Sequence, residues 1–318
     1  MTNDSEAAVT LDQLQRIQAA FDRQHGFEFA SAATGHDLAR SVFASLALCG
    51  EVGELANQIK KAQRSAWLGE DPAEHIARAK LEVGGILAYL LKLSNELDLS
   101  LDETYLTTLS DNWLRFPVRN HQATGRVVCI AGPSGSGKSS VVKRLATAGV
   151  STYVEDVAGN PYLKGVYARS PSFDARASQR WFLAQIADFV ERSNDSSTLL
   201  MDQDPAAEVR VYAHLMREDE LLSRDAYVEL LTTLAALESR LGSRQQRVTI
   251  YLDADEVTLR ARMIARGDRE VPTEAWLRRV RMSFAELSDR NRNSRLVRTE
   301  GRDVDSVVDD IADLTGLR

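Results

Sequence analysis

The sequence has few cysteines and no long apolar run. Only Cys49 and Cys129 occur among the 318 residues, and each lies in an apolar stretch. So few cysteines exclude a disulfide framework, and we expect two buried thiols in a reducing, cytoplasmic setting. No apolar segment approaches the roughly 20 residues that span a bilayer. The first ten residues are polar and acidic, unlike a signal peptide.

The chain also lacks an excess of positive charge and the common zinc motifs. Its net charge of −7 offers no overall basic field to DNA or to an anionic membrane, so we expect neither as a partner. The five histidines are scattered, and neither a CxxC pair nor an HExxH helix is present. These absences exclude the usual zinc sites.

What the sequence does contain divides into two regions near residue 120, and the length suits two domains. In the first region, apolar residues recur at three- and four-residue steps, beginning with Leu11, Leu14, Ile17 and Phe21. Further helical stretches are expected at residues 38–61, 72–97 and 101–113. Because no β-type run occurs there, residues 1–120 are predicted to form an all-α helical bundle.

The second region alternates short β-type runs with helical segments. The β-type runs are residues 126–131, 151–155, 198–202, 248–253 and 295–299. Such alternation is typical of a parallel sheet that helices cover on both faces. Residues 121–318 are therefore predicted to form an α/β domain.

A phosphate-binding loop follows the first of these runs. Residues 132–139, GPSGSGKS, fit the pattern GxxxxGK[ST], with a strand before them and a helix after them. Backbone N–H groups in such a loop point at phosphate, and the helix N-terminus adds its dipole. Lys138 can neutralise the β- and γ-phosphates, and Ser139 can hold Mg²⁺. We therefore predict ATP and Mg²⁺ as cofactors, bound by Gly132, Ser134, Gly135, Ser136, Gly137, Lys138, Ser139 and Ser140.

The loop alone does not define the reaction, since ATPases, GTPases and small-molecule kinases share it. An NKxD tetrad, which a GTPase would use to bind its base, is absent. Residues 260–270 are rich in arginine, and Arg262 and Arg266 share one helical face. Arginines that close over a transferring phosphoryl group stabilise its charge, so this segment favours a kinase with a mobile lid.

Four stretches resemble the deoxynucleoside kinases and their nucleotide-kinase relatives, over residues 125–290. Besides the phosphate loop, residues 155–163 (EDVAGNPYL) resemble the EPxxxNPYL segment, and residues 179–183 (QRWFL) resemble the QxxFL helix. Residues 251–253 (YLD) together with 262–270 resemble the lid region of that family.

The kinase resemblance implies a role for individual side chains. Glu155 would be the general base for the acceptor, and Asp202, at the end of a strand, would help to hold the metal. Gln179, Asn160 and Tyr162 would contact the substrate, and Arg262, Arg266 and Arg269 would be the lid arginines. The chain departs from the family pattern at Asp156, at Gln203, where the DRS motif has arginine, and at Asp268, where the lid has arginine.

The first region resembles the MazG-like all-α NTP pyrophosphohydrolases over residues 10–117. Glu51, Glu54 and Glu82 match carboxylates of the EExxE and ExxD signatures, which hold Mg²⁺ in that family, and the run NWLRFP resembles its NxxRFP tail. Gly50 and Gly85 stand where the family has acids. We interpret the domain as a MazG-like scaffold for dimerisation, nucleotide sensing or weak hydrolysis.

Several functions remain open at this stage. The chain is expected to phosphorylate a nucleoside or nucleotide with ATP, as a homo-oligomer, most simply a dimer. Alternatives are a bifunctional pyrophosphohydrolase and kinase, a kinase for a modified base in DNA, and a nucleotide-gated interaction module without enzymatic activity.

Overall fold

The computed structural model describes residues 10–27, 38–116, 125–166, 170, 173–193, 196–242, 244, 246–268 and 270–317. The chain divides into two compact units, Met1–Tyr105 and Leu106–Arg318. This division lies within helix α4 (Leu101–Arg115) rather than near residue 120 as expected. The reason is that Leu114 is buried in the α/β core and Asp111 pairs with Arg210 and Arg290.

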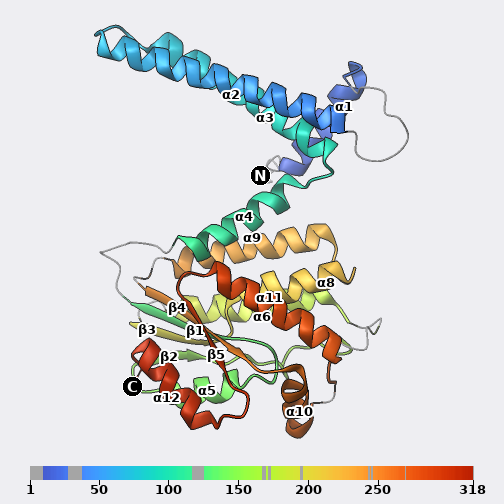
Figure 1. The fold of residues 1–318 in the computed structure, drawn as a ribbon, viewed down its shortest axis with the longest axis vertical. Helices are drawn as coiled ribbons and strands as arrows, with labels where there is room; N and C mark the ends of the chain where they lie inside the picture. Colours follow the sequence, from blue (N-terminus) through green and yellow to red (C-terminus); the bar gives the residue numbers. More distant parts are fainter. Residues whose placement is uncertain are drawn as a thin grey trace, which may run out of the picture. The chain divides into compact units, whose positions relative to one another are not determined.

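The first unit is helical, as predicted. It comprises α1 (Leu11–Gln24), α2 (Leu38–Trp67), α3 (Ala73–Glu96) and the start of α4. Thr10 begins α1 with a capping box that satisfies backbone N–H groups of the first turn. Helices α2 and α3 lie side by side as a hairpin (Figure 1), and α1 packs against α3. Asn95 of α3 joins the two helices by donating its side-chain N–H to the Gln15 carbonyl of α1 at 3.0 Å.

The second unit holds a five-stranded sheet in the order β2-β3-β1-β4-β5, and every neighbouring pair is parallel. Its strands are β1 (Arg126–Ala131), β2 (Val150–Tyr153), β3 (Thr198–Asp202), β4 (Gln246–Asp253) and β5 (Ser294–Arg298). This arrangement confirms the predicted α/β domain. Strand β1 lies in the middle, with Val127 to Ala131 fully buried.

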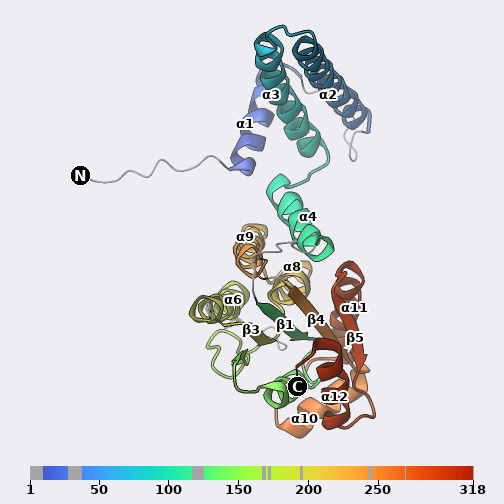
Figure 2. The ribbon, with the colours of Figure 1, turned by 90° about the vertical axis from the view of Figure 1, so that its left-hand side faces the viewer.

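Helices cover both faces of this sheet, as the views in Figures 1 and 2 show. The helices of this unit, with the π-helical segment η1, are α5 (Lys138–Leu145), α6 (Ala175–Arg192), α7 (Pro205–Ala207), η1 (Glu208–Ala213), α8 (His214–Glu218), α9 (Arg224–Leu241), α10 (Glu256–Arg266), α11 (Glu274–Arg290) and α12 (Val304–Thr315). Side chains from α6, η1, α9 and α11 form the core on one face, and those from α5 and α12 form the core on the other.

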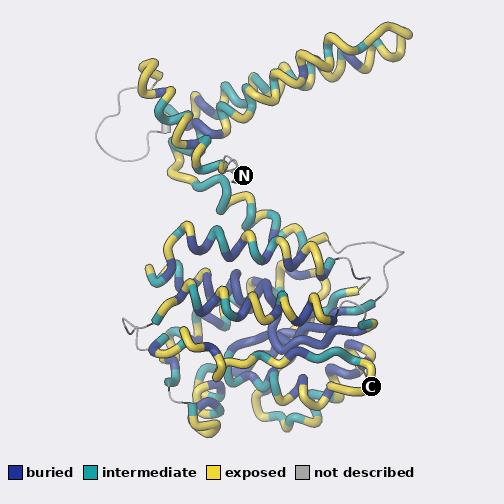
Figure 3. Tube along the Cα trace, turned by 180° about the vertical axis from the view of Figure 1, so that it is seen from behind, coloured by how far each residue is buried: buried dark blue, intermediate teal, exposed yellow. Residues whose placement is uncertain are grey.

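The two cysteines differ in exposure. Cys129 in β1 is buried, as expected, but Cys49 is exposed, so the prediction of two buried thiols was wrong for Cys49. Figure 3 shows the difference: the central strands of the sheet are largely buried, as in β1 and β3, while much of the α2–α3 hairpin is exposed or half-buried. Within the described residues, no helix is long and apolar enough to cross a membrane.

Candidate functional site

The phosphate loop connects β1 to α5, and its backbone conformation requires glycine. Gly132, Gly135 and Gly137 have φ of 146°, 83° and 101°, a region that side chains disfavour. A Cβ on Gly132 would lie 2.4 Å from the Leu252 carbonyl oxygen, and one on Gly135 would lie 2.6 Å from that of Leu259. The loop therefore approaches the end of β4 and helix α10 more closely than any side chain would allow.

Two side chains at the start of α5 carry the polar chemistry of the loop. The buried Lys138 ammonium donates to the carbonyl oxygens of Gly132 at 2.9 Å and Pro133 at 3.2 Å. Ser139 Oγ donates to Asp202 Oδ2 at 2.5 Å. Asp202 is fully buried at the end of β3, level with Ile130 of β1, because the two strands are parallel and in register.

Two glutamates adjoin this group. Glu155 follows the end of β2, and Glu208 is the first residue of η1 and is buried. Burial raises the pKa of Glu208 to about 7, against an opposing effect of Lys138. Burial and the neighbouring Glu208 raise the pKa of Glu155 well above its ordinary value. The two carboxyl groups are hydrogen-bonded to each other, so their protonation is coupled.

Gln203 occupies a strained position beside these acids. It is buried and has φ of 103°, which is unusual for a residue with a side chain. Its backbone N–H donates to the Ile130 carbonyl at 3.0 Å, and its side chain hydrogen-bonds to Glu208. A neutral carboxamide thus stands where the resembled motif has an arginine.

Two of the three predicted lid arginines lie within the described structure, and both contact the phosphate loop from α10. Arg262 donates to the Gly135 carbonyl at 3.4 Å and is held by the side chain and carbonyl of Thr299, at 2.9 and 2.7 Å. Arg266 donates to Ser134 Oγ at 3.4 Å and makes a two-point ion pair with Asp268. The predicted third arginine, Arg269, lies outside the described residues.

The predicted substrate residues differ in what they contact. Gln179 in α6 is buried, and its Oε1 has no hydrogen-bond partner within the described structure. Asn160 is also buried, but it donates to Ser178 and accepts from the Tyr162 N–H, so its amide braces the chain. The Tyr162 side chain is exposed. Of these three side chains, Gln179 is therefore the one with a buried oxygen that is available to accept a hydrogen bond from a substrate.

The helical unit does not gather its predicted metal ligands. Glu54 is exposed, while Glu51 and Glu82 are half-buried. Glu51 Oε2 lies only 2.3 Å from where a Cβ on Gly85 would be, so the Glu51 carboxylate covers that glycine. Across the part of the chain that the structure describes, no three His, Cys, Asp or Glu side chains are placed to hold a metal ion.

Sequence reasoning did not find Glu208 and Thr299. Glu208 had one usable signal: it is a lone charge in an otherwise apolar run, residues 205–209, and a buried charge needs a functional or structural reason. Thr299 had no such signal. Its Oγ reaches the carbonyls of Ser136 and Asp253 at 3.2 Å and accepts from Arg262, contacts that join three elements distant in sequence.

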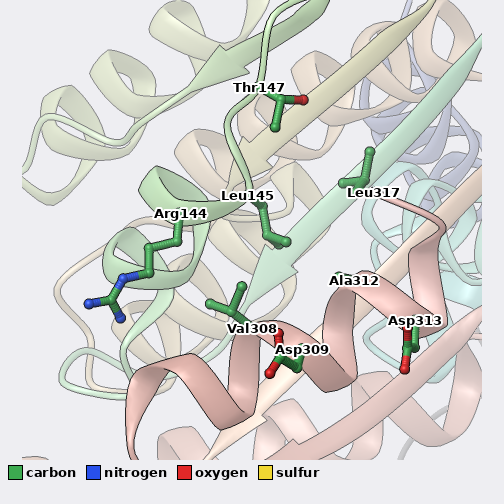
Figure 4. Close-up of a pocket in the computed structure, with 8 residues that line it drawn as sticks. All are labelled: Arg144, Leu145, Thr147, Val308, Asp309, Ala312, Asp313 and Leu317. Atoms are coloured by element: carbon green, nitrogen blue, oxygen red, sulfur yellow. The ribbon is translucent and has the colours of Figure 1, made fainter.

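One cavity lies away from the candidate site. It measures about 560 Å³ and is bordered by the end of α5 and by α12 (Figure 4). Its lining residues are Arg144, Leu145, Thr147, Val308, Asp309, Ala312, Asp313 and Leu317. None of them belongs to the phosphate loop or to the acid group, so we do not assign this cavity to the candidate site.

The fold and the site together define a kinase-type α/β domain. A parallel sheet places a phosphate loop, buried acids and two loop-contacting arginines at the carboxyl ends of its strands, where ligands of such sheets bind. The deoxynucleoside kinase family matches residues 128–309, which is more than half of the chain. The chain belongs to the deoxynucleoside kinase family.

Solved structures of kinases resemble the same part of the chain. Deoxyadenosine kinase from M. mycoides with bound dCTP is 18% identical, with a TM-score of 0.48, covering 59% of this chain and 97% of that one. Thymidylate kinase from Candida albicans is 15% identical, with a TM-score of 0.41, covering 61% of this chain and 92% of that one. A search of curated proteins found no match.

Proposed function

We propose that the α/β unit transfers the γ-phosphoryl group of ATP to a hydroxyl group of a nucleoside. The observation that carries this proposal is the grouping of Lys138, Ser139 and Asp202 with Glu155 and Glu208 at one edge of the sheet. The first three residues suit a phosphate donor, and a carboxylate next to them suits an acceptor that must lose a proton.

The donor side follows from the loop. Its backbone N–H groups and the N-terminus of α5 attract phosphate, and Lys138 can exchange its bonds to the loop carbonyls for bonds to phosphate oxygens. Arg262 and Arg266 contact the loop and can stabilise charge that develops on the transferred group.

The residues present also fit a magnesium ion. Asp202 Oδ1 is buried without a hydrogen-bond partner within the described structure, and Oδ2 meets Ser139 Oγ. Oxygen ligands of this kind are those that Mg²⁺ prefers. Ser139 and Asp202 would hold the ion, which when bound neutralises phosphate charge.

On the acceptor side, the distribution of charge favours a hydroxyl group over a phosphate. The charges of Glu208 and Asp202 help to raise the pKa of Glu155, and Gln203 contributes no positive charge. A monophosphate would meet repulsion there, whereas a hydroxyl can give its proton to Glu155. The acceptor oxygen forms a bond to the γ-phosphorus, the bond from that phosphorus to the β–γ bridging oxygen breaks, and ADP leaves.

A substrate screen tests this assignment. Purified full-length protein is incubated with ATP and either nucleosides or nucleoside monophosphates, and the products are identified by mass spectrometry. We expect nucleoside monophosphates to form from nucleosides. Phosphorylation of monophosphates alone would replace this assignment with a nucleotide kinase, and ATP hydrolysis without transfer to any acceptor would favour the interaction module.

We further propose that the helical unit is a MazG-like scaffold that pairs with a second copy of the chain. The supporting observation is the number of large apolar side chains exposed on α2 and α3, which would otherwise face water. They include Val42, Leu46, Ile59, Ile76, Leu81, Val83, Leu87 and Leu90. An isolated helical hairpin does not bury such side chains by itself, but a second hairpin packed against it would.

Light scattering coupled to size-exclusion chromatography tests the pairing. We expect the wild-type chain to be a dimer and Leu46→Glu to shift it toward the monomer. Leu314→Glu, which places the same charge at an exposed leucine of α12, serves as the matched control and should leave the mass unchanged. A monomeric wild-type protein would contradict the proposed pairing.

A further inference from the structure

The segment Asp202-Gln203-Asp204 carries the chain from β3 into the helices that follow it. Asp202 faces Ser139 at the phosphate loop. Asp204 caps α7 by accepting from the Ala206 N–H at 2.9 Å, and its own carbonyl accepts from the N–H groups of Ala207 and Glu208. Two acids of the site, Asp202 and Glu208, therefore stand on either side of Asp204 in one short stretch of backbone.

Asp204 is anchored on the far side of the central strand. It is fully buried, and its carboxylate accepts from Arg247 Nη2 at 2.6 Å and from Thr249 Oγ1 at 2.9 Å. Both partners belong to β4, and β1 separates β4 from β3 in the sheet. The carboxylate thus ties the end of β3 across β1 to a strand with which β3 makes no ladder.

The anchored segment contains strained backbone. Gln203 lies between the two aspartates and has φ of 103°, a value that is disfavoured for a residue with a side chain. Its backbone N–H donates a hydrogen bond to the Ile130 carbonyl. Strained conformations of this kind persist only where surrounding contacts over-determine them. The bonds from Arg247 and Thr249 to the adjacent Asp204 supply such contacts.

Arg247 has a second buried acid as partner, which provides an internal comparison. Its other guanidinium nitrogen donates to Glu238 of α9, which is as buried as Asp204 within a few per cent. Glu238 lies in the last turn of α9 and adjoins no residue of the site in the sequence, whereas Asp204 directly follows Gln203. Loss of either acid removes one ion pair with Arg247, but only Asp204 is adjacent in the chain to residues of the site.

We propose that Asp204 is a positioning residue for phosphoryl transfer. Through Arg247 and Thr249 it holds the strained turn at Gln203, and so keeps Asp202 and Glu208 in the positions that the reaction needs. This inference rests on the kinase reaction proposed above. Small displacements of positioned groups are costly, since an error of about 1 Å can lower a rate about 100-fold.

The test compares Asp204→Asn with Glu238→Gln in the full-length chain. Each variant removes one of the two buried negative charges that pair with Arg247, so both should lower the melting temperature. We expect Asp204→Asn to lower kcat by about tenfold or more, with KM for ATP changed by less than about twofold, because the phosphate loop itself is intact. Glu238→Gln should keep kcat within about twofold of the wild type.

A second, milder variant keeps the proposal testable if Asp204→Asn does not fold. Thr249→Val keeps the approximate volume and removes only one hydrogen bond to Asp204, while the ion pair with Arg247 stays. It should therefore also lower kcat, by a smaller factor. Equal kcat values for Asp204→Asn and Glu238→Gln would overturn the proposal. If Asp204→Asn does not fold, an unchanged kcat in Thr249→Val would overturn it as well.

A readout independent of activity separates this inference from the proposed reaction. Hydrogen–deuterium exchange at the amides of Gln203 and Glu208, both hydrogen-bonded, should be faster in Asp204→Asn than in Glu238→Gln. A wild-type protein that phosphorylates no acceptor would contradict the kinase assignment, while unchanged exchange at these two amides would contradict the anchoring by Asp204.

Discussion

The carboxylates of the two units differ in how far they are buried. In the helical unit, Glu51, Glu54 and Glu82 are exposed or half-buried on a hairpin. In the α/β unit, Asp202 and Glu208 are buried, and the second shares hydrogen bonds with Glu155 and Gln203. Burial raises the pKa of an acid, and a sheet that helices cover on both faces supplies burial that a single hairpin lacks.

This contrast assigns the chemistry to the α/β unit, and removing the phosphate-loop lysine should have the largest effect. We expect Lys138→Ala to abolish phosphoryl transfer because Lys138 supplies the positive charge at the donor site. Kinase turnover and far-UV circular dichroism measure the loss of activity and the survival of the fold. Lys143→Ala, an exposed lysine of the same helix, is the control and should be active. Unchanged turnover in Lys138→Ala would contradict the site.

Replacing the proposed base should have the next largest effect. Glu155→Gln keeps the shape of the side chain but cannot take a proton, so we expect kcat to fall by about 10²–10⁴-fold while ATP affinity stays near normal. Steady-state kinetics with titration calorimetry of ATP separate the two quantities. Asp156→Asn, which changes the neighbouring exposed acid, should retain activity. Full activity in Glu155→Gln would remove the argument for a hydroxyl acceptor.

The acid pair should also make the reaction depend on pH. Burial raises the pKa of Glu208 to about 7 and that of Glu155 well above its ordinary range, so both hold protons at low pH. Because the base, Glu155, must be deprotonated, kcat/KM should rise with pH over a range well above the ordinary pKa of a glutamate. Glu208→Gln removes a group that raises the Glu155 pKa, so the acid limb of the profile should move to lower pH. If the pH profiles of kcat/KM were the same in the wild type and in Glu208→Gln, the coupling between Glu155 and Glu208 would be contradicted.

The same pKa shift has a consequence for stability. A glutamate whose pKa is raised in the folded state stabilises the fold most below its unfolded pKa, 4.5, and this contribution is lost as the pH rises through about 7. Glu208→Gln avoids burying a charge, so its melting temperature should exceed that of the wild type at pH 8, and the gap should narrow by pH 5. Thermal denaturation at the two pH values tests this expectation, and a gap that widens toward pH 5 would be the wrong sign.

The smallest effect is expected in the helical unit. Because its three glutamates are not gathered into a metal site, the Lys138→Ala chain should release little pyrophosphate from NTPs. Gly85→Asp adds the acid that the resembled family has there, but its side chain must first displace the Glu51 carboxylate. We expect at most a weak gain in Mg²⁺ binding, measured by calorimetry. Robust pyrophosphate release that is lost in Glu54→Ala would show that the helical unit is also catalytic and would contradict this expectation.

Much of the fold was predictable because its signals are local. Strands β1 and β3 begin and end where the β-type runs predicted. Helices α3 and α4 lie within two residues of the predicted bounds, whereas α2 continues past residue 61 to Trp67. The run predicted for strand β2 began one residue late and ended two residues late, since Val154 and Glu155 continue the run without pairing. The division between the units was misplaced because composition changes after α4, while packing divides the chain within it.

The sequence by itself determined the phosphate loop, the parallel sheet and the order of the kinase-like segments. Each of these depends on residues close together in the chain: glycines that permit one backbone path, and apolar runs that form strands. Only the tertiary structure decided that Glu208 joins Glu155, that Thr299 holds Arg262, and that Asp204 reaches Arg247 across the central strand. These contacts link residues 37 to 53 positions apart, and their geometry depends on how strands align and helices cover them, which no local pattern records.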